Sequence, residues 1–407
     1  MPESDLLLPP TQFPILGNSG AVGLFSLLHI ALAGLTAGFI VLAPALEYLG
    51  IKDPFYTRLG RSLVRFVAVV FSVSAVFAVV MVELFIGLFP VSTVYIFQRF
   101  KPVVYIGAVV FLLHIWFFYT YWYRWEKTRA KSIRRHIALG AAAAVLILMW
   151  GALLDGIGSS MLTPGEGDMG GPGRSDFIRL TFLTNPTWAP LMLHRFLGVL
   201  IISFYAIALY GGLQLLWRKP KGEEEAYYTR VMHLGMVIGT GLLLIQPIAG
   251  MLYSFQIGRA NPRAYERILF ELEWLLRIQF LLIGLLFYLS NHFFSQISSH
   301  PRRSRILIGA LLLAAFFMIL AAQQVWIRRG LTLVLILMTL YHLRHVPLRE
   351  TPPHPRGAWL AISVGFCAVA TFLVMGVIRE QARRPYTVYG EIHLEDEKQP
   401  ASELAQR

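Results

Sequence analysis

The chain has 407 residues, of which 56% are hydrophobic and only 14% are charged, whereas soluble domains carry about a quarter charged residues. This composition excludes an ordinary soluble protein. The formal net charge of +13 does not indicate nucleic-acid binding, because the basic residues lie mostly in short loops between apolar runs, where they set membrane topology. The single cysteine, Cys367, excludes a disulfide within the chain and a cysteine-based metal site.

Apolar stretches of about 20 residues recur along the chain, and this length crosses the ~30 Å hydrocarbon core of a bilayer as a helix. We therefore predict an all-α fold, a polytopic transmembrane bundle of about ten helices. Two four-helix groups, the first to fourth helices and the fifth to about the eighth, would form its core, with the remaining helices added. In chain order the predicted helices cover residues 20–49, 62–89, 102–123, 135–160, 188–217, 229–256, 270–294, 305–324, 328–345 and 358–379.

Basic clusters follow alternate predicted helices, beginning with KDPFYTRLGRSLVR after the first and YRWEKTRAKSIRRH after the third. Because Lys and Arg mark cytoplasmic loops, both termini are expected on the outer face of a bacterial or archaeal plasma membrane. Residues 1–19 then form an outer tail, residues 20–390 the bundle and residues 391–407 a polar C-terminal tail. The Gly-rich loop at 164–174 is expected to be flexible.

Polar residues inside the apolar runs carry the functional information, because an ionisable side chain in the bilayer costs about 2.5–3.5 kcal/mol and usually faces the bundle interior. Helix direction places most of them toward one membrane face. Histidine together with carboxylates and arginine indicates either haem, whose iron histidine ligates, or a proton or ion transporter. In chain order the candidates are His29, Glu83, His114, Asp155, His194, Glu271, Glu273, Arg277 and Glu380.

Five segments, in order, resemble subunit I of the cytochrome bd quinol oxidases. The first predicted helix reads LLHIALAGLTAGFIVLAPALEYLG, with a His, Leu-Thr-x-Gly six to nine residues later, and a Glu eighteen residues after the His. The fourth is similar to the family's Leu-Gly-rich helix, the fifth opens with Asn-Pro before a His, and WLLRIQFLLIGLL is similar to a Trp-x-x-Arg-x-Met helix. The stretch EQARRPYTVYG at 380–390 resembles the family's Glu-x-Gly-Arg-Gln-Pro-Trp-x-Val-Tyr-Gly.

The resemblance implies one to three b-type haems and a second membrane subunit as partner. It places the axial histidine of one active-site haem at His29 and the carboxylate ligand of the other at Glu380. His194 falls on the histidine ligand of a low-potential haem near the outer face, where quinol is oxidised. Arg277 falls on an arginine expected near the propionates of that haem.

The chain departs from the family pattern at several places. Gln279 stands where the family has a methionine ligand, so either another group such as Glu273 completes that iron, or the haem is five-coordinate or absent. The third predicted helix lacks the two glutamates of the family and carries His114, a replacement haem ligand or a proton group. The long quinol loop after the sixth helix is missing, and residues 304–345 look like an inserted hairpin.

Several candidates also have a purely structural interpretation. His29, His114 and His194 would then only pack between helices, and Glu380 would pair with a neighbouring arginine. Four further histidines at predicted cytoplasmic helix ends are interpreted as interfacial: His136, His233, His342 and His345.

The remaining acidic residues are assigned to quinol or proton chemistry. Glu83 and Asp155 end the second and fourth predicted helices on the outer side, and Glu83 is either structural or a proton group. Glu271 and Glu273 begin the seventh predicted helix. Glu273 with Arg277 has the i, i+4 spacing of an ion pair on one helix face.

We predict a b-haem electron-transfer subunit of a respiratory complex, exchanging electrons with quinol or quinone near the outer face, without oxygen reduction. Electrons would pass from quinol to the haem at His194 and then to the haems at His29 and Glu380. A soluble outer-face cytochrome is an alternative donor, and basic loops around Arg259 and Arg383 would dock an acidic partner. Two other functions stay open: an oxygen-reducing bd-type quinol oxidase, and a haem-free membrane anchor or transporter.

Overall fold

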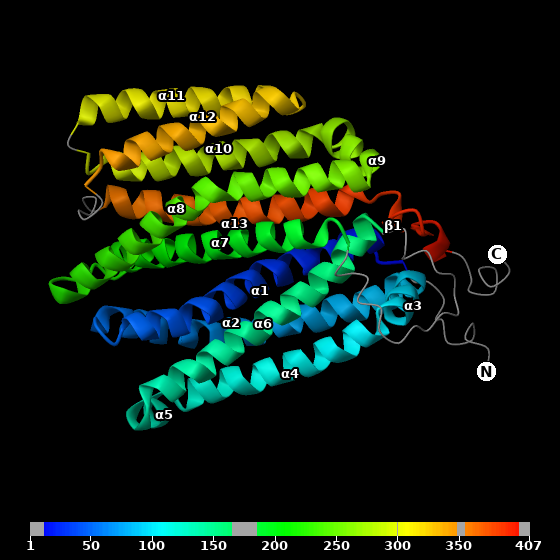
Figure 1. The fold of residues 1–407 in the computed structure, drawn as a ribbon, viewed down its shortest axis with the longest axis horizontal. Coiled ribbons are helices and arrows are strands. Elements are labelled where there is room, and N and C mark those ends of the chain that lie inside the picture. Colours follow the sequence, from blue (N-terminus) through cyan, green and yellow to red (C-terminus); the bar gives the residue numbers. More distant parts are fainter. Residues whose placement is uncertain (1–11, 165–184, 299, 348–354, 399–407) are drawn as a thin grey trace. The chain divides into compact units, whose positions relative to one another are not determined.

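The computed structural model describes residues 12–164, 185–298, 300–347 and 355–398, so the predicted flexible loop at 164–174 lies almost wholly outside the described residues. Within these ranges the protein is helical apart from one small hairpin (Figure 1), which confirms the predicted fold class. Ten described helices are long and apolar enough to cross a membrane, as predicted. They are α1 (Gly17–Leu49), α2 (Pro54–Leu88), α4 (Lys101–Tyr123), α6 (Ile133–Leu162), α7 (Trp188–Trp217), α8 (Glu223–Ala260), α10 (Glu273–Ser295), α11 (Pro301–Leu320), α12 (Val325–Arg344) and α13 (Arg356–Ala382).

Shorter elements connect the long helices, and local sequence explains where several of them begin. The Asp53 side chain accepts a hydrogen bond from the Phe55 amide at 3.0 Å, and Pro54 follows it in the first turn of α2, a favourable helix start. Prolines also stand in the first turns of α4 and α11. The short elements are α3 (Pro90–Arg99), α5 (Trp125–Lys131), α9 (Pro262–Glu266) and the π-helical turn η3 (Arg267–Glu271).

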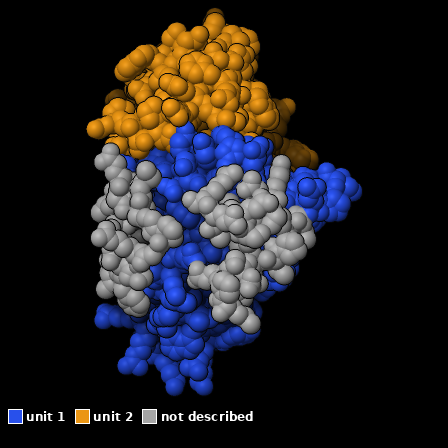
Figure 2. Space-filling view, turned by 90° about the vertical axis from the view of Figure 1, so that its right-hand side faces the viewer, with its two compact units in different colours: residues 1–192, 383–407 blue, residues 193–382 orange. Residues whose placement is uncertain are grey.

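The chain divides into two compact units, coloured separately in Figure 2. Unit 1 comprises residues 1–192 and 383–407, and unit 2 comprises residues 193–382. The first four predicted membrane helices therefore belong to unit 1, and the boundary falls within α7.

In unit 1, α1 packs against α2 and α6, and α6 also packs against α4 (Figure 1). Gly140 of α6 lies where this packing is tightest. A Cβ atom at Gly140 would lie 2.9 Å from the ring of Tyr121 in α4 and 3.1 Å from Pro44 in α1. The absence of a side chain at this position therefore lets α6 approach both neighbours, as small residues do between membrane helices.

The segment after α13 belongs to unit 1 and forms a small antiparallel hairpin, β1 (Tyr386–Val388) with β2 (Ile392–His393), followed by η4 (Asp396–Lys398). Glu397 of η4 is buried and accepts hydrogen bonds from the amides of Val91 at 3.0 Å and Ser92 at 2.8 Å, at the start of α3. Residues 391–398, which the sequence suggested as part of a tail, thus pack against the helices. Burial raises the pKa of the Glu397 carboxyl, against the lowering effect of its hydrogen bonds.

Unit 2 is built around close contacts of α7 with α8 and of α10 with its neighbours. A Cβ atom at Gly235 of α8 would lie 2.4 Å from the carbonyl oxygen of Phe204 in α7, so these two backbones touch. The helix α10 packs against α11 and α13, and α11 packs against α12. The hairpin predicted at 304–345 is therefore α11 and α12, joined by a short turn.

Candidate functional site

His29 of α1 is half-buried and held by α2. Its Nδ1 atom lies 3.0 Å from the carbonyl oxygen of Ser74 and 3.2 Å from the Ser74 hydroxyl. A carbonyl oxygen only accepts, so Nδ1 carries the proton and Nε2 keeps its lone pair. No described residue hydrogen-bonds to Nε2. Histidines that ligate metals show this arrangement, with the second nitrogen donating to a backbone carbonyl.

His114 of α4 repeats the same pattern in a fully buried place. Its Nδ1 atom lies 2.9 Å from the carbonyl oxygen of Ala143 in α6. Its Nε2 atom is buried and has no hydrogen-bond partner among the described residues. The rings of Phe71, Phe111 and Phe118 surround the imidazole at centroid distances of 6.1–6.3 Å. An unpaired buried polar atom costs about 1–3 kcal/mol, so this nitrogen is poised for a ligand.

One turn of α2 connects these two histidines. Ser74 contacts His29 from α1, and Phe71, three residues earlier on α2, contacts His114 from α4. Residues three apart on a helix share a face, so both imidazoles approach the same turn of α2. Unit 1 thereby brings together two predicted site residues that lie 85 positions apart in the sequence.

His194 of α7, in unit 2, has a different hydrogen-bond pattern. The Gln246 side-chain nitrogen donates to the His194 carbonyl oxygen at 3.0 Å and lies 3.1 Å from the His194 Nδ1 atom. Because an amide nitrogen donates, Nδ1 accepts in this arrangement and the proton stands on Nε2. The Gln246 side-chain oxygen is buried without a hydrogen-bond partner among the described residues. Turning this amide would place its oxygen against the His194 carbonyl oxygen, so the bond to that carbonyl holds the amide in this orientation.

Gln279 of α10 is 3% exposed, and its side-chain oxygen is also buried without a described partner. Unit 2 therefore contains three buried side-chain amide oxygens without a partner among the described residues, those of Gln214, Gln246 and Gln279. An amide oxygen is a weak ligand for low-spin haem iron, but it readily accepts a hydrogen bond from a bound molecule.

The charged candidates of unit 2 lie near helix ends. Glu273 and Arg277 form the i, i+4 ion pair, with the Arg277 Nε atom 2.9 Å from a Glu273 oxygen. Glu271 is exposed and pairs with Arg267 at 3.0 Å across η3. Glu380 is exposed in the last turn of α13. The Arg267 Nε atom also donates to the Gln381 carbonyl oxygen at 3.2 Å, which joins η3 to the end of α13 beside that carboxylate.

The two acidic candidates of unit 1 differ in exposure. Asp155 of α6 is 3% exposed, whereas Glu83 of α2 is exposed. Glu83 lies toward the end of the unit that contains the N-terminus of α1, since Ala21 of α1 packs against Leu88 at the end of α2.

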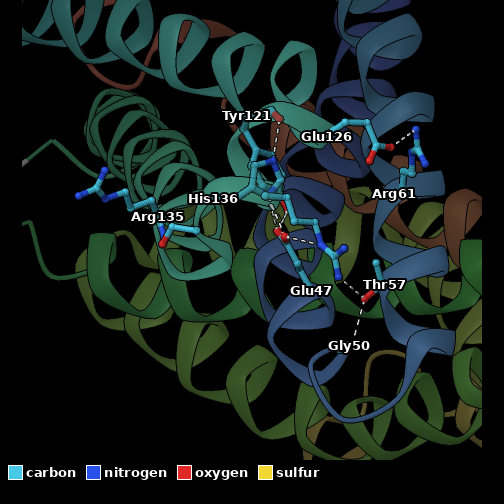
Figure 3. Close-up of polar contacts among 10 residues, drawn as sticks. Glu47, Gly50, Thr57, Arg61, Tyr121, Glu126, Arg135 and His136 are labelled. Carbon is cyan, nitrogen blue, oxygen red and sulfur yellow. Dashed lines mark hydrogen bonds and ion pairs between the residues drawn. The ribbon is translucent and has the colours of Figure 1, made fainter.

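The opposite end of unit 1 contains a polar cluster that the sequence interpretation missed, shown in Figure 3. Glu47 at the end of α1 is fully buried, and its two oxygens lie 2.7 and 2.8 Å from the Nδ1 atom of His136 in α6. The Tyr121 hydroxyl donates to Glu47 at 2.9 Å, and Arg129 approaches it at 3.4 Å. The His136 Nε2 atom faces the Tyr121 carbonyl oxygen at 3.1 Å. Both nitrogens thus face acceptors, the Glu47 carboxylate and the Tyr121 carbonyl oxygen.

The interfacial interpretation of His136 and His342 was wrong, because both are buried, at 0% and 3% exposure. Basic neighbours in the sequence suggested a solvated helix end, but each imidazole faces a polar side chain on another helix. For His136 the available signal was Glu47, the acidic residue that closes the first apolar run. His345, also interpreted as interfacial, is exposed in the structure.

The model for the family described as cytochrome bd terminal oxidase subunit I matches residues 21–266, more than half of the chain. The chain belongs to this family. The match includes His29, His114 and His194 and ends before Gln279 and Glu380. Among solved structures, the bd oxidase from Geobacillus thermodenitrificans is similar with a TM-score of 0.55 and 14% sequence identity, over 90% of this chain and 98% of that chain. At this identity the likeness concerns the fold. No curated protein matched the chain.

The bd family normally binds b-type haems, and the residues of this member fit that group unequally. In unit 1, His29 and His114 each direct Nδ1 to a backbone carbonyl and leave Nε2 available. In unit 2, His194 fits a haem less well, because the Gln246 amide donates both to its Nδ1 atom and to its carbonyl oxygen, which leaves the proton on Nε2. No group of three or more His, Cys, Asp or Glu residues that would hold a bare metal ion occurs among the described residues.

Proposed function

We propose that this bd-family protein is a membrane b-haem electron-transfer subunit of a respiratory complex, which exchanges electrons with quinol or quinone near the outer membrane face without reducing oxygen. The observation that supports it best is the pair formed by His29 and His114. Each has its Nδ1 proton directed to a backbone carbonyl, and neither Nε2 atom has a described partner. The Nε2 atom of His114 is also buried, and a structural histidine in an apolar bundle gains nothing from an unpaired buried nitrogen.

In this proposal His29 and His194 hold haem iron, and Glu380, Gln279 and His114 are further ligand candidates. The haem, when bound, supplies one-electron transfer between ferric and ferrous iron. The protein's part is to hold the imidazoles: the Ser74 carbonyl fixes the ring of His29 and raises its basicity as a ligand.

Quinol would bind in unit 2, where the polar groups include unpaired acceptors. Oxidising one quinol releases two electrons and two protons. Gln279 would accept a hydrogen bond from a quinol hydroxyl, and Glu271 and Glu273 would take the two released protons, which leave on the outer side. The two electrons would pass one at a time to the haem held by His194. Arg277 would neutralise a propionate only if it left its ion pair with Glu273.

Oxygen reduction is the part of the family chemistry that this sequence supports least. Reducing one O₂ to two waters consumes four electrons and four protons, so acidic residues must deliver protons to the site. The membrane helix α4, which carries His114, contains no Asp or Glu. The imidazole is enclosed instead by aromatic rings.

Two other functions have specific support. Family membership favours an oxygen-reducing quinol oxidase. The buried, hydrogen-bonded Glu47–His136 pair favours a haem-free transporter or anchor, since proton relays use such groups. As a partner we propose the second membrane subunit usual in bd oxidases, with an acidic redox subunit docking near Arg259 and Arg383.

The deciding experiment is a reduced-minus-oxidised spectrum of the purified protein with haem quantified chemically. We expect a b-type α-band that is lost or reduced at least severalfold in His29→Ala and His194→Ala. The exposed His300 serves as the control, and His300→Ala should keep the wild-type haem content. Folded wild-type protein without a Soret band would reject the haem proposal.

A second measurement separates electron transfer from oxygen reduction. With a reduced quinol added to the haem-loaded complex, we expect reduction of the haem band without steady oxygen consumption on an oxygen electrode. Sustained, cyanide-sensitive oxygen uptake would show instead that the protein is a true oxidase.

A further inference from the structure

The segment from residue 274 to residue 349 contains no Asp or Glu, although it carries eight arginines. It includes the α11–α12 hairpin, which lies beyond the residues matched by the family model. No acidic residue of this segment can therefore pair with these arginines. The arginines at the two ends of the hairpin differ in what contacts them instead.

At the turn between α11 and α12, other groups of the protein contact the two arginines, Arg328 and Arg329. The Arg328 Nη1 atom donates to the Ala322 carbonyl oxygen at 2.6 Å, and its guanidinium lies 4.9 Å from the centre of the Phe280 ring. Arg329 lies 5.1 Å from the centre of the Trp326 ring. These contacts stabilise a guanidinium without an acidic partner.

At the other end, the arginines have no such contacts. None of the arginines there forms an ion pair, a hydrogen bond or an aromatic contact with a described residue, and all are exposed: Arg302, Arg303, Arg305 and Arg344. An unpaired arginine at the end of a membrane helix lies at the level of the lipid head groups.

A hollow lies among these residues, between the start of α11 and the end of α12. Its rim carries His300, Arg303, Tyr341 and His345, and Ser304 lies at its base. The His345 Nδ1 atom donates to the Tyr341 carbonyl oxygen at 2.7 Å, so its Nε2 atom is available to an outside group.

The floor of the hollow is a series of hydrogen bonds between neutral side chains. The Asn291 side-chain nitrogen donates to Thr339 at 2.9 Å and to the Phe287 carbonyl, which fixes its oxygen as an acceptor. That oxygen lies 2.9 Å from the His342 Nδ1 atom, so His342 is protonated at Nδ1 and accepts the Ser304 hydroxyl through Nε2 at 3.1 Å. The rim therefore carries one formal cation, Arg303, above a rigid polar floor.

We propose that this hollow binds the phosphate group of an anionic phospholipid. Phosphate suits an arginine donor such as Arg303 beside a hydroxyl group such as that of Tyr341, and basic pockets between membrane helices bind anionic head groups. A lipid is the source because exposed apolar side chains continue from the hollow along both helices: Ile306 is 67% exposed, Leu337 54% and Leu340 47%. These surfaces would receive the acyl chains.

The test compares purified full-length protein in nanodiscs of phosphatidylglycerol and of phosphatidylcholine, with bound lipid counted by native mass spectrometry. We expect phosphatidylglycerol to be retained preferentially. Arg303→Gln should weaken that retention about fivefold, the effect of one basic residue near an anionic surface. The matched control is Arg305→Gln, which removes the same charge beside the hollow but does not line it.

Equal losses in the two variants, or equal retention of both lipids by the wild type, would overturn the proposal. A further arm adds inorganic phosphate to the phosphatidylcholine sample. Protection against thermal unfolding by phosphate equal to that by phosphatidylglycerol would identify a free-anion site and reject the lipid. Size-exclusion profiles and helical circular dichroism identical to those of the wild type establish that both variants are folded.

Discussion

His114 and His136, two fully buried histidines of unit 1, differ by a single hydrogen bond. Both nitrogens of His136 face acceptors, the Glu47 carboxylate and the Tyr121 carbonyl oxygen. Only one nitrogen of His114 does, and its Nε2 atom has no described partner. A buried imidazole with both nitrogens bonded stabilises the fold, whereas one with a free nitrogen is arranged for something the polypeptide does not supply. Burial alone does not distinguish these two roles.

The largest expected loss of stability comes from removing His136, the histidine whose two nitrogens both face hydrogen-bond acceptors. His136→Ala leaves the Glu47 carboxylate buried beside only Tyr121 and the more distant Arg129. Breaking a buried pair on one side costs about 3–5 kcal/mol, so we expect a large fall in the thermal unfolding midpoint in detergent. An unfolding midpoint equal to that of the wild type would show that the Glu47–His136 bond does not stabilise the fold. His136 would then not be the structural histidine of the two.

A smaller loss is expected from Tyr121→Phe, which keeps the ring and deletes the hydroxyl that donates to Glu47. A hydrogen bond to a charged group contributes about 1.5–3 kcal/mol. The thermal unfolding midpoint in detergent measures this loss as well. Tyr119→Phe, on the same helix but without a hydrogen bond to Glu47, serves as the control and should change the midpoint little.

Glu397 is a buried carboxylate that differs from Glu47, because among the described residues no cation pairs with it. Its partners are the Val91 and Ser92 amides and the Ser92 hydroxyl. Burial raises its pKa, so the folded state holds this proton more tightly than the unfolded state. The resulting stabilisation is present at low pH and is lost as pH rises through the raised pKa.

Hydrogen exchange at residues 386–398 should therefore become faster, relative to the intrinsic rate, as the pH increases. Glu397→Gln should abolish this dependence and change stability by about 0.5–2 kcal/mol, as for other helix caps. Unchanged pH dependence in the variant would assign the effect to another group.

The smallest effect on stability, and the most informative, is expected for His114→Phe. Phenylalanine suits a pocket of aromatic rings and removes the unpaired nitrogen, so the haem-free protein should change by less than about 1 kcal/mol. Haem content should nevertheless fall. A variant that binds haem as the wild type does would show that His114 is structural, and the contrast with His136 would then lose its functional meaning.

Periodicity and apolar length were sufficient to predict the all-α fold and its ten membrane helices, because an isolated membrane helix satisfies its own backbone and is recognisable locally. The family resemblance was confirmed by the match over residues 21–266. The Glu47–His136 pair escaped prediction because its members lie 89 positions apart and meet only where α1 and α6 approach at Gly140. Likewise, Ser74 gives no sequence signal as a partner for His29, since the contact is made through its backbone carbonyl.

By itself, the amino-acid sequence determined that this protein crosses a membrane repeatedly, where most of its helices begin and end to within a few residues, and which polar side chains lie among the apolar ones. The starts of α2 and α8, at Pro54 and Glu223, come earlier than predicted. The tertiary structure alone decided what those side chains face. It separated an imidazole with both nitrogens bonded from one with a free nitrogen, and arginines stacked on aromatic rings from arginines without a partner. The physical reason is that hydrogen bonds and ion pairs act over about 3–4 Å, a distance set by helix packing that no local pattern encodes.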